Sequence, residues 1–112
     1  MLLKRVYSPA DPGDGFRVLV DRLWPRGVSK ERAAVDLWAK DVAPSAELRT
    51  AFHRDGMTWP AFADAYRAEL RDNPALAPLR ETLAGHEVVT LLYSVADEER
   101  NHAALLREAL TG

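Results

Sequence analysis

The chain has 112 residues, a formal net charge of -2 and no cysteine. This length accommodates one domain, residues 1–112, which can bury roughly two thirds of the surface that the unfolded chain exposes. The lack of cysteine excludes disulfides, a thiol nucleophile, a cysteine-based zinc site and an iron–sulfur cluster. The net charge argues against a general nucleic-acid coat protein, because phosphate-driven binding depends on the number of basic contacts.

The N-terminal part of the chain predicts two strands joined by a constrained loop. Residues 2–7 carry β-branched and aromatic side chains and indicate a first strand. Two prolines, two glycines and two aspartates fall within residues 9–15, so we expect a loop with specific backbone angles. Residues 16–24 predict a second strand, and its centre, residues 18–20, is apolar as expected of a strand covered on both faces. A Pro-Arg-Gly sequence at residues 25–27 ends it.

The next segments predict a short helical turn, an extended piece and a helix. Ser29 is expected to cap a helical turn over residues 30–34, and residues 35–38 indicate a short extended segment. Ser45 is expected to cap a helix with an apolar face. The residues that share this face are Leu48, Ala51 and Phe52.

Two further helices follow. Thr58 is expected to cap the first of them, in which apolar residues recur at the spacing of one buried stripe. These residues are Trp59, Phe62, Ala63, Tyr66 and Leu70. Asn73 and Pro74 mark the start of the next helix, but Pro78 would disrupt its first turns, so the helix is free to start later than Pro74. Gly85 is expected to end it.

The C-terminal part predicts the most apolar strand and a final helix. Residues 88–93 are six β-favouring residues without a charge, which indicates a buried strand. Ser94 and Asp97 form a Ser-x-x-Asp capping pattern, so we expect a final helix that runs to about Leu110. Three apolar strands separated by helices predict an α/β fold, a small single domain with a short, mostly parallel sheet flanked by helices. The alternative is a helix-dominated α+β arrangement.

Polar residues lie just after two of the predicted strands. In parallel α/β sheets, ligands bind outside the carboxyl ends of the strands, where loops and helix N-termini converge. The candidate site residues are therefore the polar residues that follow the second and the last strand. They are Asp21, Arg22, Arg26, Lys30, Tyr93, Asn101 and His102.

The basic residues of this set favour a small anionic ligand. Arg22 and Arg26 suit planar recognition of a carboxylate or a phosphate, and Lys30 adds a compact positive charge. Residues 17–32 hold five basic residues against two acidic ones, a local charge of +3. Asp21 could orient a guanidinium group or act as a base. The alternative is a structural ion pair between Asp21 and one arginine, with Arg26 and Lys30 in solvent.

His102 has two interpretations. It shares a helical face with three apolar residues that follow it, and a histidine on such a face is usually a structural residue of the core. It also lies near the start of the final helix, where the helix dipole disfavours the protonated imidazole. A neutral ring beside Asn101 could bind a polar group or transfer a proton, so Asp21 and His102 are the candidate acid–base residues if the protein is an enzyme.

The sequence predicts no metal centre and no cofactor. Its three histidines lie in different segments without the spacing of metal ligands. Ser94 lacks the flanking glycines of a serine-hydrolase nucleophile, and no glycine-rich phosphate-binding loop is present. No apolar run is long enough to cross a bilayer, and the N-terminus does not resemble a signal peptide. We therefore expect a cytoplasmic protein without a membrane partner.

Motifs along nearly the whole chain are those of a known family. The sequence VLVDRLWPRG at residues 18–27 is the most specific of them, and VTLLY at residues 89–93 and NHA at residues 101–103 follow. Together these motifs resemble the domain-of-unknown-function (DUF) 488 family, in its short YeaO-like branch. The resemblance implies a small bacterial α/β domain with no established activity. In the longer branch a cysteine stands where the last strand ends; this chain has Tyr93 there, which excludes a thiol-based mechanism.

Three hypotheses of function follow. The first is a pocket at the carboxyl ends of the strands that binds a small phosphate or carboxylate. The second is a nucleic-acid or protein-binding module that uses the basic loop of residues 22–32 with an exposed Trp24, because arginine and aromatic side chains together favour stacking on single strands. The third is architectural: the arginines brace loops, so that Arg22→Ala would lower the melting temperature without abolishing any binding. Strand order and oligomeric state do not follow from the sequence.

Overall fold

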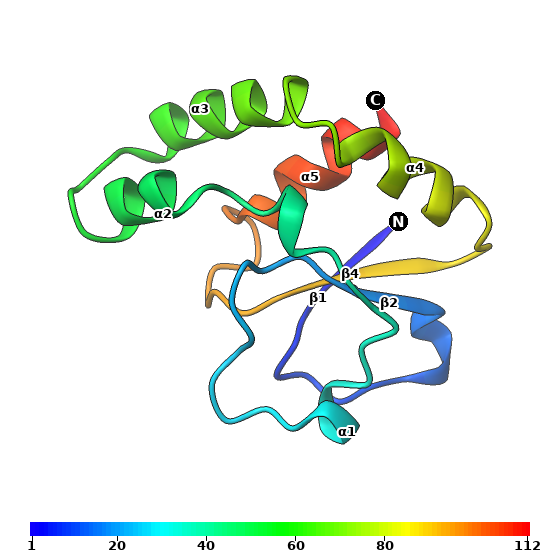
Figure 1. Cartoon of the computed structure of the whole chain (residues 1–112). Coiled ribbons are helices and arrows are strands. Elements are labelled where there is room, and N and C mark those ends of the chain that lie inside the picture. Colours follow the sequence, from blue (N-terminus) through cyan, green and yellow to red (C-terminus); the bar gives the residue numbers. More distant parts are fainter.

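A sheet of four parallel strands forms the centre of the molecule (Figure 1). The computed structural model describes the whole chain, residues 1–112. The strands are β1 (Leu2–Arg5), β2 (Phe16–Leu19), β3 (Leu37–Trp38) and β4 (Val89–Tyr93), in the order β1-β4-β2-β3. Every neighbouring pair is parallel, which confirms the predicted fold class and adds the strand order.

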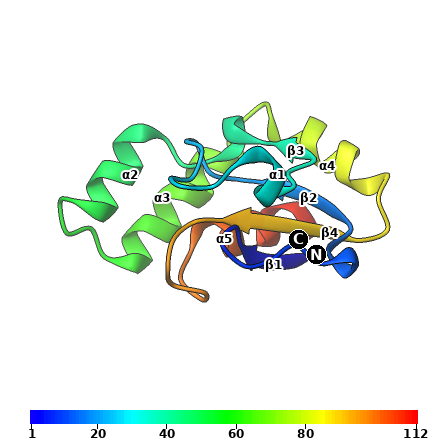
Figure 2. The ribbon, with the colours of Figure 1, turned by 90° about the horizontal axis from the view of Figure 1, so that it is seen from below.

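Helices cover the two sides of the sheet unequally. On one side lie α2 (Ala46–His53), α3 (Trp59–Arg71), α4 (Leu76–Ala84) and α5 (His102–Thr111), whereas the short α1 (Lys30–Ala33) lies on the other (Figure 1). Figure 2 shows that α2 and α3 extend beyond the carboxyl ends of the strands. None of the helices is both long and apolar enough to span a membrane.

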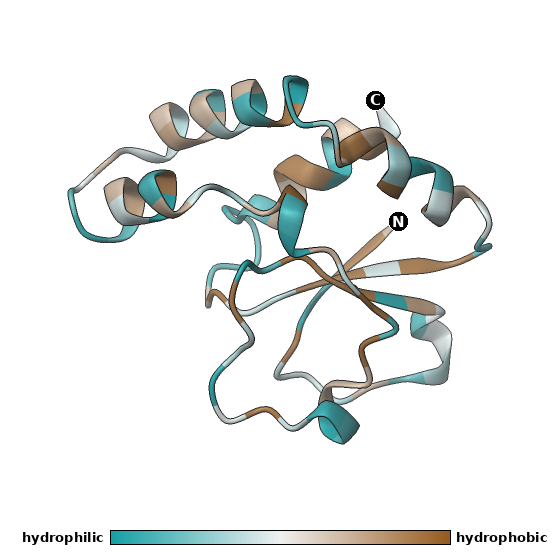
Figure 3. Cartoon of the chain, in the orientation of Figure 1, coloured by the Kyte–Doolittle hydropathy of each residue, from teal (hydrophilic) through white to brown (hydrophobic).

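The hydrophobic core is divided by the sheet. A cluster of 17 buried residues joins one face of the strands to α2 through α5, and a smaller cluster of five lies on the side of α1. Figure 3 shows the hydrophobic residues concentrated on the strands and on α5. Alternation along the strands assigns the side chains: Leu91 and Tyr93 belong to the larger cluster, and Leu92 belongs to the smaller one. All five residues of β4 are buried, as the sequence predicts for a central strand.

Three predicted helix caps are confirmed. The side chain of Ser29 accepts a hydrogen bond from the backbone at the start of α1, Ser45 does so for α2, and Thr58 does so for α3. Each cap satisfies an amide that has no partner within its helix. Cap patterns of this kind are local, which is why the sequence predicts them well.

The predicted start of the final helix is wrong. The Asp97 carboxylate accepts hydrogen bonds from the backbone amides of Glu99 and Arg100, which closes a turn instead of opening a helix. These two bonds also hold the pKa of Asp97 below its ordinary range. The helix cap is Asn101, whose Oδ1 accepts from the amide of Ala104 at 2.9 Å while its Nδ2 donates to the Asp97 carbonyl at 3.0 Å.

The predicted end of the second strand is wrong, whereas the start of α4 agrees with the sequence. β2 ends at Leu19, not at residue 24: the amide of Val20 still donates to the Leu92 carbonyl, but the chain then turns away from the sheet. α4 starts at Leu76, two residues after Pro74, as the position of Pro78 allows. The earlier end of β2 leaves residues 21–26 free to line a pocket.

A buried ionic network lies near the amino end of β2. Asp14, the last residue of the 3-10 helix η1 (Pro12–Asp14), forms ion pairs with Lys4 and Arg17. The Arg17 guanidinium also donates to the carbonyls of Ala33 and Ala34, which attaches α1 to the sheet. Arg17, part of the basic segment in the sequence, is therefore a structural residue far from the carboxyl ends of the strands.

Candidate functional site

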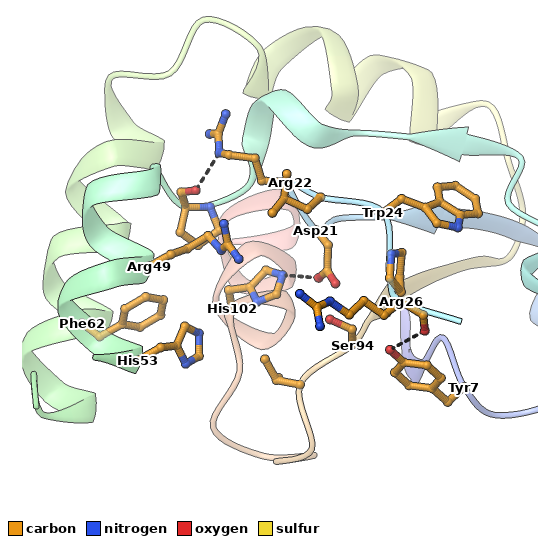
Figure 4. Close-up of a pocket in the computed structure, with 14 residues that line it drawn as sticks. Tyr7, Asp21, Arg22, Trp24, Arg26, Arg49, His53, Phe62, Ser94 and His102 are labelled. Carbon is orange, nitrogen blue, oxygen red and sulfur yellow. Dashed lines mark hydrogen bonds and ion pairs between the residues drawn. The ribbon is translucent and has the colours of Figure 1, made fainter. Parts of the chain in front are cut away.

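A pocket of about 380 Å³ lies at the carboxyl ends of β1, β2 and β4 (Figure 4). We call it the strand-end pocket. Residues 21–26 after β2, together with Ser94 and His102 from beyond β4, form one side, and Arg49 and His53 of α2 form the opposite side. The volume is in the range of small-molecule sites. The pocket lies where a parallel α/β sheet is expected to bind ligands.

Asp21 and His102 form a buried pair in this pocket. The His102 Nε2 atom lies 3.0 Å from the Asp21 Oδ1 atom, and the two side chains are only 11% and 10% exposed. The contact is poorly aligned for a hydrogen bond, and neither atom has another hydrogen-bonding partner. The structure thus brings together the two candidate acid–base residues, one from the end of β2 and one from the first position of α5.

The surroundings of the Asp21–His102 pair hold it in place. The Trp38 indole donates to the Asp21 carbonyl at 2.7 Å, which anchors the backbone of the loop. The Tyr66 ring lies edge-on to the imidazole, with 6.5 Å between ring centroids, and its hydroxyl donates to the Val42 carbonyl at 2.6 Å. Burial raises the pKa of Tyr66 far above its ordinary value, and the nearby Glu69 adds to this effect. Tyr66 is therefore a neutral packing residue.

Arg26 and Arg49 extend into the pocket from opposite sides. Figure 4 shows their guanidinium groups directed toward the Asp21–His102 pair. Neither guanidinium makes a hydrogen bond or an ion pair within the chain, although both residues line the pocket. The Tyr7 hydroxyl donates to the Arg26 carbonyl at 3.2 Å, which attaches the loop after β2 to the loop after β1. Two arginines without partners thus lie beside the nearly buried Asp21–His102 pair.

Arg22 also lines the pocket, but its guanidinium is occupied. Its Nε atom donates to the Pro44 carbonyl at 3.0 Å, and one terminal nitrogen donates to the Ala43 carbonyl at 3.1 Å. These bonds attach the loop after β2 to the segment between the 3-10 helix η2 (Lys40–Val42) and α2. For Arg22, as for Arg17, the geometry agrees with the architectural hypothesis.

Replacing Arg22 with alanine is expected to lower the free energy of unfolding by about 1–3 kcal/mol, because two carbonyls lose charge-assisted hydrogen bonds. Urea unfolding of the variant and the wild type measures the difference. Arg71→Ala is the control, since Arg71 is exposed at the end of α3 and makes no side-chain hydrogen bond or ion pair. Equal stability of Arg22→Ala and Arg71→Ala would contradict the bracing role.

The other predicted residues do not line the strand-end pocket. Lys30 is exposed on α1, on the opposite side of the sheet from α2. Tyr93 is 2% exposed and packs in the larger core cluster. This burial raises the pKa of Tyr93, and the negative charge of Glu98 adds a smaller increase. Asn101 is buried and uses its side-chain amide to cap α5. Of the seven candidates, the pocket contains Asp21, Arg22, Arg26 and His102.

The pocket also contains two residues that are not among the predicted site residues. Arg49 and His53 are four positions apart on α2 and therefore share a helical face. This spacing is visible in the sequence, but nothing in the sequence shows that the face borders the carboxyl ends of the strands. That placement depends on how α2 packs against α3.

The expected exposure of Trp24 is wrong. Its indole nitrogen donates to the Val28 carbonyl at 2.7 Å, and its ring lies edge-on to Trp38 with 5.5 Å between centroids. The half-buried side chain packs against the smaller core cluster, so the loop folds back over its own aromatic residue. Trp24 is therefore only partly available for the base stacking that the second hypothesis requires, and it lines the strand-end pocket.

Comparisons with known proteins agree with the motifs. The family described as "Inactive DUF488-N3 subclade" matches residues 1–112. An uncharacterised protein of Mycobacterium tuberculosis (strain H37Rv) is 48% identical over 108 residues, which cover 96% of this chain and 91% of the relative. The uncharacterised protein YeaO of Escherichia coli (strain K12) is 44% identical over 107 residues, 96% of this chain and 93% of YeaO. No solved structure matches the chain. The chain belongs to the DUF488 family, within the subclade that this description names.

Proposed function

We propose that this protein binds a small anion, a phosphate or a carboxylate, in the strand-end pocket. The observation that carries the proposal is the pair of arginines, Arg26 and Arg49, that line one pocket and have no protein partner for their guanidinium groups. Arginine is well suited to bidentate contacts with carboxylates and phosphates. An anion between the two guanidinium groups would supply the acceptors that the chain does not.

The charge around the pocket supports an anionic ligand. Three arginines and one aspartate line it, which leaves an excess of two positive charges with the histidines neutral. His102, the first residue of α5, lines the pocket, so the N-terminal end of that helix lies close to the same space. Hydrogen bonds to charged groups contribute about 1.5–3 kcal/mol each, so two arginine contacts correspond to dissociation constants on the order of millimolar or below.

Binding is favoured over catalysis. The Asp21 carboxylate contacts His102, and both side chains are nearly buried. A general acid or base must reach the group that it serves, and little of either side chain is accessible from the pocket. The description of the family as inactive also supports a pocket that binds.

Titration with inorganic phosphate and with acetate tests the proposal. We expect saturable heat in isothermal titration calorimetry and a rise in melting temperature that grows with ligand concentration, because a ligand of the folded state stabilises it. Sodium chloride at matched ionic strength serves as the control and should give neither effect. The absence of saturable binding for both anions would overturn the proposal. Binding of a single-stranded oligonucleotide that disappears with salt would favour the basic-loop alternative instead.

A further inference from the structure

We infer that the anion carries a hydrophobic group, aromatic or branched, that lies against aromatic side chains of α2 and α3. The inference rests on the proposed function and narrows its ligand to an amphipathic anion. Its basis is a second pocket that is continuous with the strand-end pocket and has a different character. We call it the aromatic pocket; Phe52, Trp59 and Phe62 form its apolar wall.

The two pockets share a boundary. The aromatic pocket has a volume of about 430 Å³ and has four lining residues in common with the strand-end pocket. They are His53, Phe62, Val95 and His102. Figure 4 shows Phe62 and His53 on the side of the strand-end pocket that is formed by α2 and α3. A ligand whose charged end lies between Arg26 and Arg49 could therefore extend its other end past His53 into the aromatic pocket.

The wall of the aromatic pocket is a packed set of three rings. The rings of Phe52 and Phe62 are stacked with 4.5 Å between centroids, and those of Trp59 and Phe62 are stacked with 5.6 Å between centroids. Phe62 is 3% exposed, whereas Phe52 and Trp59 are only half-buried. The two half-buried rings leave apolar surface open at the pocket, and a hydrophobic group would remove that surface from water.

The charges of the two pockets differ in a way that fits an amphipathic ligand. The strand-end pocket has an excess of positive charge, whereas the aromatic pocket is lined by one aspartate and one arginine, Asp97 and Arg100. The Asp97 carboxylate is already occupied by two backbone amides of its own loop. The aromatic pocket therefore has no net formal charge and no free carboxylate, although Arg100 lines it without a side-chain partner, and its three rings offer apolar surface to an uncharged hydrophobic group.

Matched pairs of anions test the inference. Calorimetric titrations compare acetate with phenylacetate and inorganic phosphate with phenyl phosphate at constant ionic strength. We expect the phenyl compound of each pair to have a dissociation constant lower by about 10-fold or more, because the apolar surface that a phenyl group buries is similar to that of a phenylalanine side chain. Nuclear Overhauser effects from the phenyl protons to the rings of Phe52 and Trp59 are expected as well, and they require no substitution.

A substitution at Phe52 tests whether the aromatic pocket causes the preference for the phenyl compound. In Phe52→Ala the preference for the phenyl compound should fall toward one. Phe16→Ala is the matched control: Phe16 is a half-buried ring that stacks on His86 at the amino end of β2, outside both pockets, and its loss should leave the preference unchanged. If Phe52→Ala fails to fold, the Overhauser effects decide.

Each remaining outcome separates the inference from the proposed function. Equal affinity for the two members of each pair, with saturable binding of both, would overturn the inference and leave the anion pocket in place. A phenyl preference that survives in Phe52→Ala, or Overhauser effects to other rings only, would also overturn it. No binding of any of the four anions would overturn the proposed function itself.

Discussion

Replacing Arg17 with alanine is expected to lower the free energy of unfolding by about 3–5 kcal/mol, a large fraction of the stability of a domain of this size. Arg17 is 4% exposed, pairs with Asp14 and donates to the carbonyls of Ala33 and Ala34. Its removal leaves a buried carboxylate with Lys4 as its remaining cationic partner and leaves the two carbonyls without these bonds.

Urea unfolding measures the effect. Arg32→Ala, at an exposed position on α1 without a side-chain bond, is the control and should stay within about 0.5 kcal/mol of the wild type. A double-mutant cycle with Asp14→Ala should show a coupling energy, because the two side chains are in direct contact. A loss below about 1 kcal/mol for Arg17→Ala would contradict the structural role of the network, since breaking a buried pair costs more than that.

The ionic network around Asp14 also makes the free energy of unfolding depend on pH. Burial by itself would raise the pKa of Asp14, but hydrogen bonds from Lys4, the Asp11 amide and Arg17 outweigh it and hold the pKa below its ordinary value of 3.8. A lowered pKa in the folded state means that this stabilisation is fully present above the unfolded pKa and is lost as pH falls through the folded pKa. Arg17→Ala removes one of these bonds, so its acid unfolding should begin at a higher pH than in the wild type.

Replacing both Arg26 and Arg49 with glutamine is expected to weaken phosphate binding by about 100-fold or more. Each guanidinium offers charge-assisted hydrogen bonds, and the loss of one such contact lowers affinity by roughly 10-fold or more. The folded state should be little affected, since neither side chain bonds to the chain. Calorimetric titration of the two single variants and the double variant measures the loss.

Lys30→Gln is the matched control for these variants. It removes one positive charge from the same basic segment but lies outside the strand-end pocket. Its phosphate affinity should stay within about 2-fold of the wild type, as expected for an exposed charge remote from the ligand and screened by salt. If Lys30→Gln weakens binding as much as Arg49→Gln, the ligand is held by the basic loop and the pocket is not its site.

Local signals account for the parts of the structure that the sequence predicts well. The caps at Ser29, Ser45 and Thr58 involve backbone amides only a few residues away, so the pattern contains the whole interaction. The capping pattern of Ser94 and Asp97 predicts a helix start that the structure does not have, because the Asp97 carboxylate instead accepts from the amides of Glu99 and Arg100 and closes a turn. Two local structures competed there, and the capping pattern does not distinguish them.

Some residues of the strand-end pocket can be predicted from the ends of the strands, whereas others are placed there by helix packing. Asp21, Arg26 and His102 follow the carboxyl ends of β2 and β4, so the general rule for parallel sheets places them in one pocket. Tyr93 ends β4 as well, but that strand is buried on both faces, so the sequence does not show which face the ring takes. Arg49 lies on α2, and its position follows from long-range packing that no local pattern contains.

The most direct test of the anion site is a nitrogen–proton correlation spectrum of the protein titrated with inorganic phosphate, recorded for backbone amides and arginine Nε groups. We predict saturable shifts at the Nε groups of Arg26 and Arg49 and at the amides of Ser94 and His102, all with one dissociation constant. Shifts confined to Lys30 and Arg32, or no saturable shift at either arginine, would contradict the account.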